Sequence, residues 1–181
     1  MAMKDDIAEV LFTEQRLAEI VKEMGERISR DYTGKNLVMI SVLKGSLIFM
    51  ADLMRAVTIP CSIDFLSVSS YGSGTTTTGE VRILKDLDTS LEGKDVLVVE
   101  DILDSGVTLS FLLKNLSARH PNSIRLCTLL DKPERRRVDI RPDYVGAQVP
   151  DRFIVGYGLD YAEKYRNLPY IGVLKPEVYA G

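Results

Sequence analysis

The sequence predicts an α/β fold in which a mainly parallel, twisted sheet is flanked by helices. Strand patterns and helix patterns alternate along the chain, an order that is typical of strand–helix–strand units. Several strand segments are almost continuously apolar, as in LVMISVL at 37–43, which indicates strands that are covered on both faces. The chain has 181 residues, of which 45% are apolar, so it is long enough to form one domain around one core.

Each element is predicted from its residue pattern. Between Thr13 and Gly34, apolar side chains recur at helical spacing, which predicts an amphipathic helix. Pro60 ends a second helical stretch, and leucines on one face indicate a third helix. Apolar or alternating runs predict the strands. The elements expected after the first helix are, in order, a strand at 37–43, a helix at 46–57, strands at 61–71 and 95–103, a helix at 108–119, and strands at 123–130, 153–158 and 170–175.

Residues 71–80, YGSGTTTTGE, have neither a helix pattern nor a core pattern. A glycine-rich and threonine-rich segment of this kind inside a compact domain is often a functional lid. We therefore expect this segment to close over a site and to exclude water from the reacting groups.

Charge and hydropathy exclude several classes of protein. The chain has 23 Lys and Arg against 26 Asp and Glu, a net charge of −3, so a general binder of nucleic acid is not expected. No apolar run approaches the roughly 20 residues of a membrane-spanning helix. The first residues lack a basic stretch followed by an apolar one, so no secretory signal is visible. We expect a cytoplasmic protein with no nucleic-acid partner and no membrane partner.

The cysteines and the single histidine exclude further chemistry. Cys61 and Cys127 are isolated, so neither a disulfide framework nor zinc-ligand spacing is present. His120 precedes Pro121 in an expected turn, where a solvated residue is the simplest interpretation. Catalysis of the Ser-His-Asp or Cys-His type would depend on this one histidine. Acid–base chemistry is therefore expected from carboxylates, lysine or tyrosine.

The most informative stretch is VVEDILDSGVT at 98–108, in which a buried strand ends in an acidic pair and a hydroxyl-containing loop leads into a helix. The carboxyl ends of parallel strands are where open α/β sheets bind ligands. The loop N–H groups and the helix N-terminus suit a phosphate monoester, with Ser105 and Thr108 as additional donors. Beside such a site, Glu100 and Asp101 suggest ribose hydroxyls together with Mg²⁺.

A simpler interpretation of the same stretch is that Asp104 caps the helix and that the acidic pair is solvated. The apolar strand before the pair favours the functional interpretation. Neither GxxxxGK[ST] nor GxGxxG occurs in the chain, so a P-loop and a dinucleotide fingerprint have no support.

The stretch VVEDILDSGVT resembles the phosphoribosyl pyrophosphate motif of type I phosphoribosyltransferases. Four further segments are similar, in order, to signature segments of the hypoxanthine-guanine branch of that family in its compact bacterial form. They are SVLKGSLIF (41–49), SSYGSGTTTTGE (69–80), LLDKPERRR (129–137) and PDRFIVGYGLDYAEKYRNLP (150–169).

The resemblance implies a purine salvage enzyme with Mg²⁺ as cofactor. Its reaction transfers the phosphoribosyl group from phosphoribosyl pyrophosphate to hypoxanthine, and to guanine, giving IMP or GMP and pyrophosphate. It implies a single phosphoribosyltransferase domain over 1–181, with a core at about 35–150 and a hood from about 1–12 and 150–181. Relatives of this kind suggest a homodimer or a homotetramer.

Site roles follow from the positions that match the family's motifs. Asp104 matches the acid that protonates or deprotonates purine N7, and Lys132 matches the lysine that donates to the 6-oxo group. Glu100 and Asp101 match the ribose and metal carboxylates, and Asp160 matches a carboxylate toward a second Mg²⁺. The other substrate-binding positions that the resemblance implies are Lys44, Gly45, Ser70, Tyr71, Ile102, Leu103, Ser105, Gly106, Val107, Thr108, Phe153, Ile154 and Arg166.

Within that set, Lys44 and Gly45 fall on the family's pyrophosphate loop, which has a cis peptide before the lysine. Arg166 matches a pyrophosphate contact, Phe153 the aromatic ring that stacks on the base, and Ile154 a backbone contact to the purine edge. Residues 105–108 match the cradle of the 5′-phosphate, and Ser70 and Tyr71 head the expected lid.

From the residues alone, some of these positions have simpler interpretations. Lys132, before a proline, is typical of a surface residue, Phe153 of a core aromatic, and Arg166 of a surface charge. Arg135, Arg136 and Arg137 are most simply a solvated run or a subunit-interface run.

Two other functions stay open. An RNA-binding regulator of nucleotide synthesis on the same fold would keep the phosphoribosyl site and add a basic face, which the net charge of −3 disfavours. A xanthine-preferring sibling enzyme is the nearer alternative. Adenine is disfavoured because Lys132 would face an amino donor. The sequence does not decide between hypoxanthine and guanine.

Overall fold

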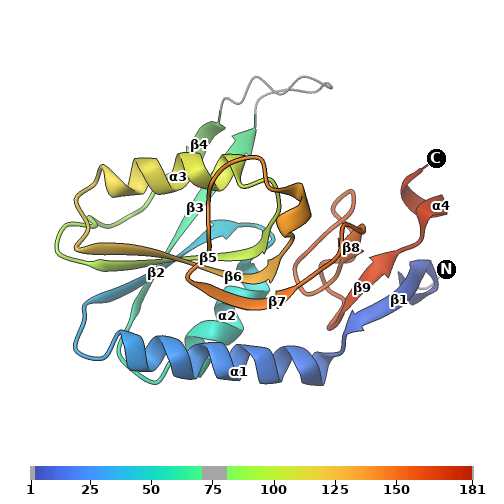
Figure 1. The fold of residues 1–181 in the computed structure, drawn as a ribbon, viewed down its shortest axis with the longest axis horizontal. Helices are drawn as coiled ribbons and strands as arrows, with labels where there is room; N and C mark the ends of the chain where they lie inside the picture. Colours follow the sequence, from blue (N-terminus) through green and yellow to red (C-terminus); the bar gives the residue numbers. More distant parts are fainter. Residues whose placement is uncertain (1–2, 71–80, 181) are drawn as a thin grey trace.

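The computed structural model describes residues 3–70 and 81–180, which form two sheets (Figure 1). The main sheet has six strands in the order β4-β3-β2-β5-β6-β7, and every neighbouring pair is parallel except β3 with β4. The expected mainly parallel sheet is confirmed. Its strands are β2 (Leu37–Leu43), β3 (Ser62–Ser70), β4 (Val81–Lys85), β5 (Asp95–Leu103), β6 (Ser123–Asp131) and β7 (Tyr144–Gln148).

The small sheet brings the two ends of the chain side by side (Figure 1). Its order is β1-β9-β8 and both pairs are antiparallel. Its strands are β1 (Ile7–Phe12), β8 (Ile154–Val155) and β9 (Ile171–Leu174). It lies beyond the carboxyl end of the main sheet (Figure 1).

Helices cover both faces of the main sheet. Figure 1 shows α1 (Glu14–Asp31) and α2 (Leu47–Ala56) on one face and α3 (Val107–Ser117) on the other. The short helices are η1 (Met3–Asp6), η2 (Pro133–Arg135) and α4 (Pro176–Tyr179). The Thr13 side chain accepts the Arg16 N–H and caps α1, where the predicted apolar stripe is buried. Among the described residues, no helix is long and apolar enough to cross a membrane.

Successive side chains of the central strands point to opposite faces of the main sheet, which divides the core into two layers. In β5, Leu97 and Val99 pack with α1 and α2, whereas Val96 and Val98 pack with the leucines of α3. All four side chains are buried, as the continuous apolar run predicted. The central strand is therefore fixed from both sides, and its carboxyl end is a rigid place for functional groups.

Some expectations are wrong in detail. The sequence patterns did not reveal β1, β4 or β7, and the strand expected at 153–158 is limited to Ile154–Val155. That strand ends because the next three residues have positive φ values, +98° at Gly156, +51° at Tyr157 and +101° at Gly158. The expected lid at 71–80 lies outside the described residues, as do Tyr71 and the side chain of Ser70.

Candidate active site

The loop after β5 makes a tight turn at the carboxyl end of the main sheet. Gly106 is the N-cap of α3 and has a φ of +79°. A Cβ at this position would lie 2.6 Å from the Ile140 side chain, so the turn requires glycine. The Ser105 hydroxyl accepts the N–H of Val107 at 3.4 Å. The turn thus gathers a hydroxyl and backbone N–H groups at the start of a helix.

A cavity of about 220 Å³, here called the loop cavity, opens beside this turn. Hydroxyl groups and N–H groups at a helix N-terminus are the donors that bind phosphate groups in proteins. The cavity is lined by Val42, Glu100, Ile102, Leu103, Asp104, Ser105, Gly106, Thr108 and Leu109.

The acidic pair lies half-buried at the end of β5. Burial raises the pKa of Glu100 well above its usual range, and the neighbouring Asp101 carboxylate raises it further. Burial also raises the pKa of Asp101 to about 6, although the N–H of Ile102, at 2.7 Å, and the Arg166 charge act in the opposite direction. A cation or hydroxyl donors beside this pair would favour the charged carboxylates.

The Asp101 carboxylate packs against the loop between β2 and α2. A Cβ added to Gly45 would overlap the Asp101 carboxylate, and a Cβ added to Gly158 would overlap the Gly45 carbonyl oxygen. The peptide bond between Leu43 and Lys44 is cis, as the resemblance implies. The glycines therefore let three segments meet at the acidic pair: the carboxyl-terminal part of β5, the loop between β2 and α2, and the segment that carries Gly158.

Two cations lie on the same side of the acidic pair. The Arg166 guanidinium donates to the Gly158 carbonyl oxygen at 2.8 Å and is 3.1 Å from Asp160 Oδ1. Lys44 Nζ is 3.1 Å from Glu163 Oε2, and this hydrogen bond is the main reason that the pKa of Glu163 is lowered. Arg166 Nε is buried and has no hydrogen-bond partner among the described residues.

A second cavity of about 500 Å³, here called the aromatic cavity, lies between the strand ends and the small sheet. Ile102 and Asp104 line both cavities. Lys132 is only 5% exposed, and its Nζ donates to the Arg152 carbonyl oxygen at 3.0 Å and lies 3.8 Å from Asp151 Oδ1. The interpretation of Lys132 as a surface residue is wrong, because the side chain is a buried cation in the cavity wall.

Phe153 forms part of the aromatic wall of this cavity. Its ring stacks on Tyr179 at a centroid distance of 4.8 Å and meets Tyr161 edge-to-face at 5.4 Å. The side chain is 38% exposed, so the interpretation of Phe153 as a core aromatic is wrong. An exposed aromatic face at a cavity is suited to stacking on a planar ring.

Asp104 stands where the two cavities meet. Its Oδ1 is buried and accepts no hydrogen bond from the described residues, although Arg135 Nε lies 3.3 Å away. The interpretation of Asp104 as a helix cap is wrong, since the N-cap of α3 is Gly106 and no side chain caps it. Arg135 also pairs with Asp151 at 3.2 Å.

The pairing of Arg135 and Asp151 at the aromatic cavity was not predicted, because no local sequence pattern links 135 with 151. The expectation of a solvated run is also wrong for Arg136. Its guanidinium pairs with Asp131 and donates to the Asp104 carbonyl oxygen at 3.1 Å, so it anchors the loop.

The expected site residues that the structure describes lie in three neighbouring places. Glu100 and residues 102–106 and 108 line the loop cavity, with Val107 beside them in the first turn of α3. Lys132, Phe153, Ile154 and Asp160 line the aromatic cavity, while Lys44, Gly45 and Arg166 lie on the Asp101 side.

The donor set fits Mg²⁺ only in part. Within 3–70 and 81–180, no three histidine, cysteine or carboxylate side chains converge on one point. Mg²⁺ in proteins is usually held by one or two carboxylates, with water and substrate phosphate oxygens completing the octahedron. The half-buried pair of Glu100 and Asp101, whose charged forms are disfavoured without a cation, fits that arrangement.

Gly158→Ala is expected to lower the free energy of unfolding by about 3 kcal/mol, because the new Cβ meets the Gly45 backbone and the left-handed φ becomes strained. Gly93→Ala is the matched control. Its φ is +71° and no described atom lies within 4 Å of a Cβ built there, so the expected loss is about 1 kcal/mol. Urea unfolding measures both. Equal losses would mean that the contact between Gly158 and Gly45 contributes nothing.

The chain is similar to known proteins over nearly its whole length. The family model described as the phosphoribosyl transferase domain matches residues 8–162. A hypoxanthine-guanine phosphoribosyltransferase of Staphylococcus aureus is 55% identical over 178 residues, which are 98% of this chain and 99% of that protein. A bifunctional TilS/HprT protein of Listeria monocytogenes is 54% identical over 99% of this chain and 28% of its own length.

Solved structures show the same relationship. A crystal structure of a hypoxanthine phosphoribosyltransferase from Staphylococcus aureus has a TM-score of 0.96 at 55% identity and covers 99% of this chain and 97% of its own. A Trypanosoma cruzi hypoxanthine phosphoribosyltransferase, in a ternary complex with substrates, has a TM-score of 0.92 at 46% identity. It covers 97% of this chain and 99% of its own. The chain therefore belongs to the phosphoribosyltransferase family, in the group of the hypoxanthine-guanine phosphoribosyltransferases.

Proposed function

We propose that this protein is a purine salvage enzyme that transfers the phosphoribosyl group from phosphoribosyl pyrophosphate to hypoxanthine or guanine. The observation that carries the proposal is the aromatic cavity, where Lys132 and Asp104 line one space beside the loop cavity. A buried ammonium group suits the 6-oxo group of the base, and a carboxylate suits the neighbouring N7–H. Full-length similarity to hypoxanthine-guanine phosphoribosyltransferases supports the same reaction.

The base is proposed to stack on Phe153, with the Ile154 backbone at its edge and the small sheet acting as the hood. In this arrangement the hood comprises about 1–12 and 150–181, and the core about 35–150. The 5′-phosphate is proposed to bind at residues 105–108, in the loop cavity. The ribose then lies beside Glu100 and Asp101, between the two cavities.

The proposed reaction is a displacement at the ribose anomeric carbon. Purine N9 forms a bond to C1′, the bond from C1′ to the pyrophosphate oxygen breaks, and the N7 proton passes to the Asp104 carboxylate. In the reverse direction protonated Asp104 returns that proton. Pyrophosphate leaves toward Lys44 and Arg166, whose positive charges stabilise the developing negative charge.

Mg²⁺ is the proposed cofactor. Glu100 and Asp101 would hold one ion beside the ribose, and Asp160 would lie toward a second ion at the pyrophosphate. When bound, Mg²⁺ neutralises the charge of the leaving pyrophosphate. Asp160 already accepts the N–H of Glu163 at 3.0 Å, which holds its carboxylate in place.

Lys132→Met is expected to lower kcat/KM for hypoxanthine about 100-fold, because a charge-assisted hydrogen bond to the 6-oxo group is lost. The KM for phosphoribosyl pyrophosphate is expected to stay at the wild-type value, which serves as the internal control. Initial rates at varied concentrations of each substrate give both parameters. A wild-type kcat/KM for hypoxanthine would remove Lys132 from base recognition.

The function is tested by incubating the protein with hypoxanthine, phosphoribosyl pyrophosphate and Mg²⁺. IMP and pyrophosphate are expected to form in equal amounts. Release of pyrophosphate without IMP would indicate hydrolysis only, and the absence of both products would contradict the proposal.

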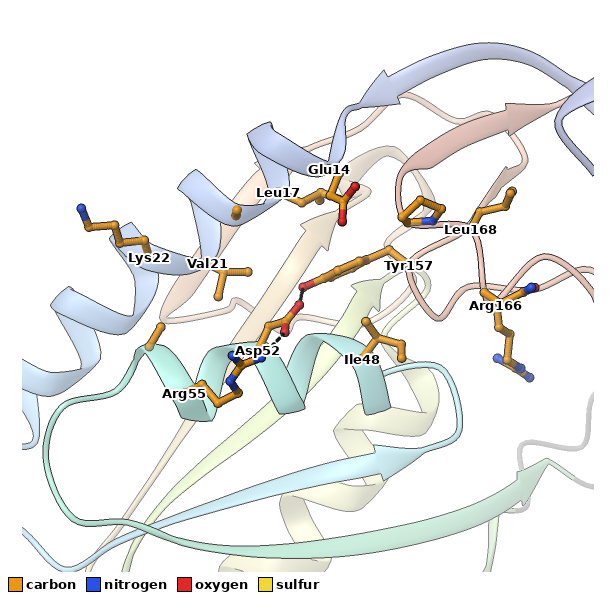
Figure 2. Close-up of a pocket in the computed structure, with 14 residues that line it drawn as sticks. Glu14, Leu17, Val21, Lys22, Ile48, Asp52, Arg55, Tyr157, Arg166 and Leu168 are labelled. Atoms are coloured by element: carbon orange, nitrogen blue, oxygen red, sulfur yellow. Dashed lines mark hydrogen bonds and ion pairs between the residues drawn. The ribbon is translucent and has the colours of Figure 1, made fainter.

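A homodimer or homotetramer in the cytoplasm is part of the same proposal. A groove of about 540 Å³ lies between α1, α2 and the segment that carries Tyr157 and Leu168 (Figure 2). Inside it, the Tyr157 hydroxyl donates to Asp52 Oδ2 at 2.5 Å (Figure 2). On α2, Leu47 and Ile48 are 46% and 39% exposed, which suits a contact with a second copy. Sedimentation equilibrium measures the oligomeric state.

A further inference from the structure

The Glu163 carboxylate lies between the two cations that the proposed function assigns to pyrophosphate. Its Oε2 is 3.1 Å from Lys44 Nζ, and its Oε1 is 3.4 Å from Arg166 Nη2. Each carboxylate oxygen thus pairs with one cation. The proposed reaction gives Glu163 itself no role, yet its carboxylate makes the contacts that a phosphate oxygen would make.

A strained turn directs Glu163 toward these cations. Tyr161 and Lys164 exchange two backbone hydrogen bonds, at 3.1 and 3.0 Å, so Ala162 and Glu163 form a two-residue hairpin turn. Their φ values are +50° and +61°. Turns with two positive φ values usually contain Asn and Gly, because side chains with a Cβ are strained there. Strain of this kind is concentrated at functional positions.

We propose that Glu163 is an internal anion that competes with pyrophosphate for Lys44 and Arg166 and so sets the affinity of that site. This inference rests on the proposed function. In the free protein the carboxylate pairs with both cations, and it shares Arg166 with Asp160, whose Oδ1 lies 3.1 Å from the guanidinium. When pyrophosphate binds, its more highly charged oxygens displace the carboxylate, and when the product leaves, Glu163 returns to the same partners.

The exposure of the pair suits such an exchange. The Lys44 and Glu163 side chains are 68% and 65% exposed, and exposed ion pairs are weak and screened by salt. Because this ion pair breaks easily, Glu163 does not block the proposed pyrophosphate site. It reduces the gain in free energy when pyrophosphate binds, which prevents the product from binding too tightly.

Glu163→Gln tests the proposal, because it keeps the length of the side chain and removes the charge. Isothermal titration with inorganic pyrophosphate and Mg²⁺ is expected to give a Kd about three- to tenfold lower than that of the wild-type protein. The inhibition constant of pyrophosphate against IMP formation is expected to fall by the same factor. Both differences are expected to shrink in high salt.

Glu26→Gln is the matched control. Glu26 is an exposed residue of α1 that lines neither the loop cavity, nor the aromatic cavity, nor the groove beside α1 and α2, and its substitution changes the net charge by the same amount. It is expected to keep the wild-type Kd. An unchanged or higher Kd in Glu163→Gln, or an equal fall in Glu26→Gln, would overturn the inference while leaving the proposed function intact. A wild-type protein that forms IMP but does not bind pyrophosphate would also overturn it, whereas the absence of IMP formation would overturn the proposed function.

Discussion

Asp104→Asn is expected to lower the turnover of hypoxanthine by about 10²- to 10⁴-fold, the usual contribution of a general acid or base. Asn has almost the same shape as Asp but cannot take up the N7 proton. The wild-type carboxylate is placed for that transfer, because Asp104 lines the cavity proposed for the base and its buried Oδ1 accepts no hydrogen bond from the described residues, with only an ion pair to Arg135 at 3.3 Å.

The substitution is expected to leave the binding of phosphoribosyl pyrophosphate unchanged, since the phosphate groups are assigned to other residues. Titration calorimetry with phosphoribosyl pyrophosphate and Mg²⁺ measures this. Asp139→Asn is a matched control, because the Asp139 side chain is 95% exposed and lines neither of the two cavities nor the groove. Turnover near the wild-type value in Asp104→Asn would exclude proton transfer by this carboxylate.

Removal of divalent cations is expected to reduce IMP formation to less than about one-thousandth, and Mg²⁺ or Mn²⁺ is expected to restore it. Without a cation, the charge of the leaving pyrophosphate is stabilised only by Lys44 and Arg166, which already pair with Glu163. Glu100 and Asp101 would also lose the cation that favours their charged forms.

The measurement compares initial rates in excess chelator with rates in chelator saturated with Mg²⁺, which controls for effects of the chelator itself. Full activity in excess chelator would show that the reaction does not need the metal, and the roles proposed for the three carboxylates would be withdrawn.

The centre of the fold was predictable because local patterns determine it. The continuous apolar run of β5 is buried by helices on both faces, and the acidic pair and glycine turn that follow it occur where the sequence placed them. The strands that were missed lie at edges. Residues of β1 and β4 are mostly half-buried or exposed, so they lack the apolar pattern that identifies an interior strand.

The candidate site was predictable only where a motif is continuous in the sequence. Asp104 and residues 105–108 follow one strand, so their neighbourhood is local. The pair of Lys44 and Glu163 joins positions that are 119 residues apart, and no spacing rule connects them. The same holds for Arg135 and Asp151, which meet only because η2 and the segment before β8 share a wall of the aromatic cavity.

The central claim, that this is a hypoxanthine-guanine phosphoribosyltransferase, is tested most directly by a panel of nucleobases. The measurement is kcat/KM for hypoxanthine, guanine, xanthine, adenine and uracil, each with phosphoribosyl pyrophosphate and Mg²⁺. Hypoxanthine or guanine is expected to exceed adenine and uracil by about 10³-fold or more, because Lys132 would face an amino donor in adenine and a single ring would not reach both Lys132 and Asp104. A preference for adenine or uracil, or for xanthine over both other 6-oxopurines, or no nucleotide from any base, would contradict the claim.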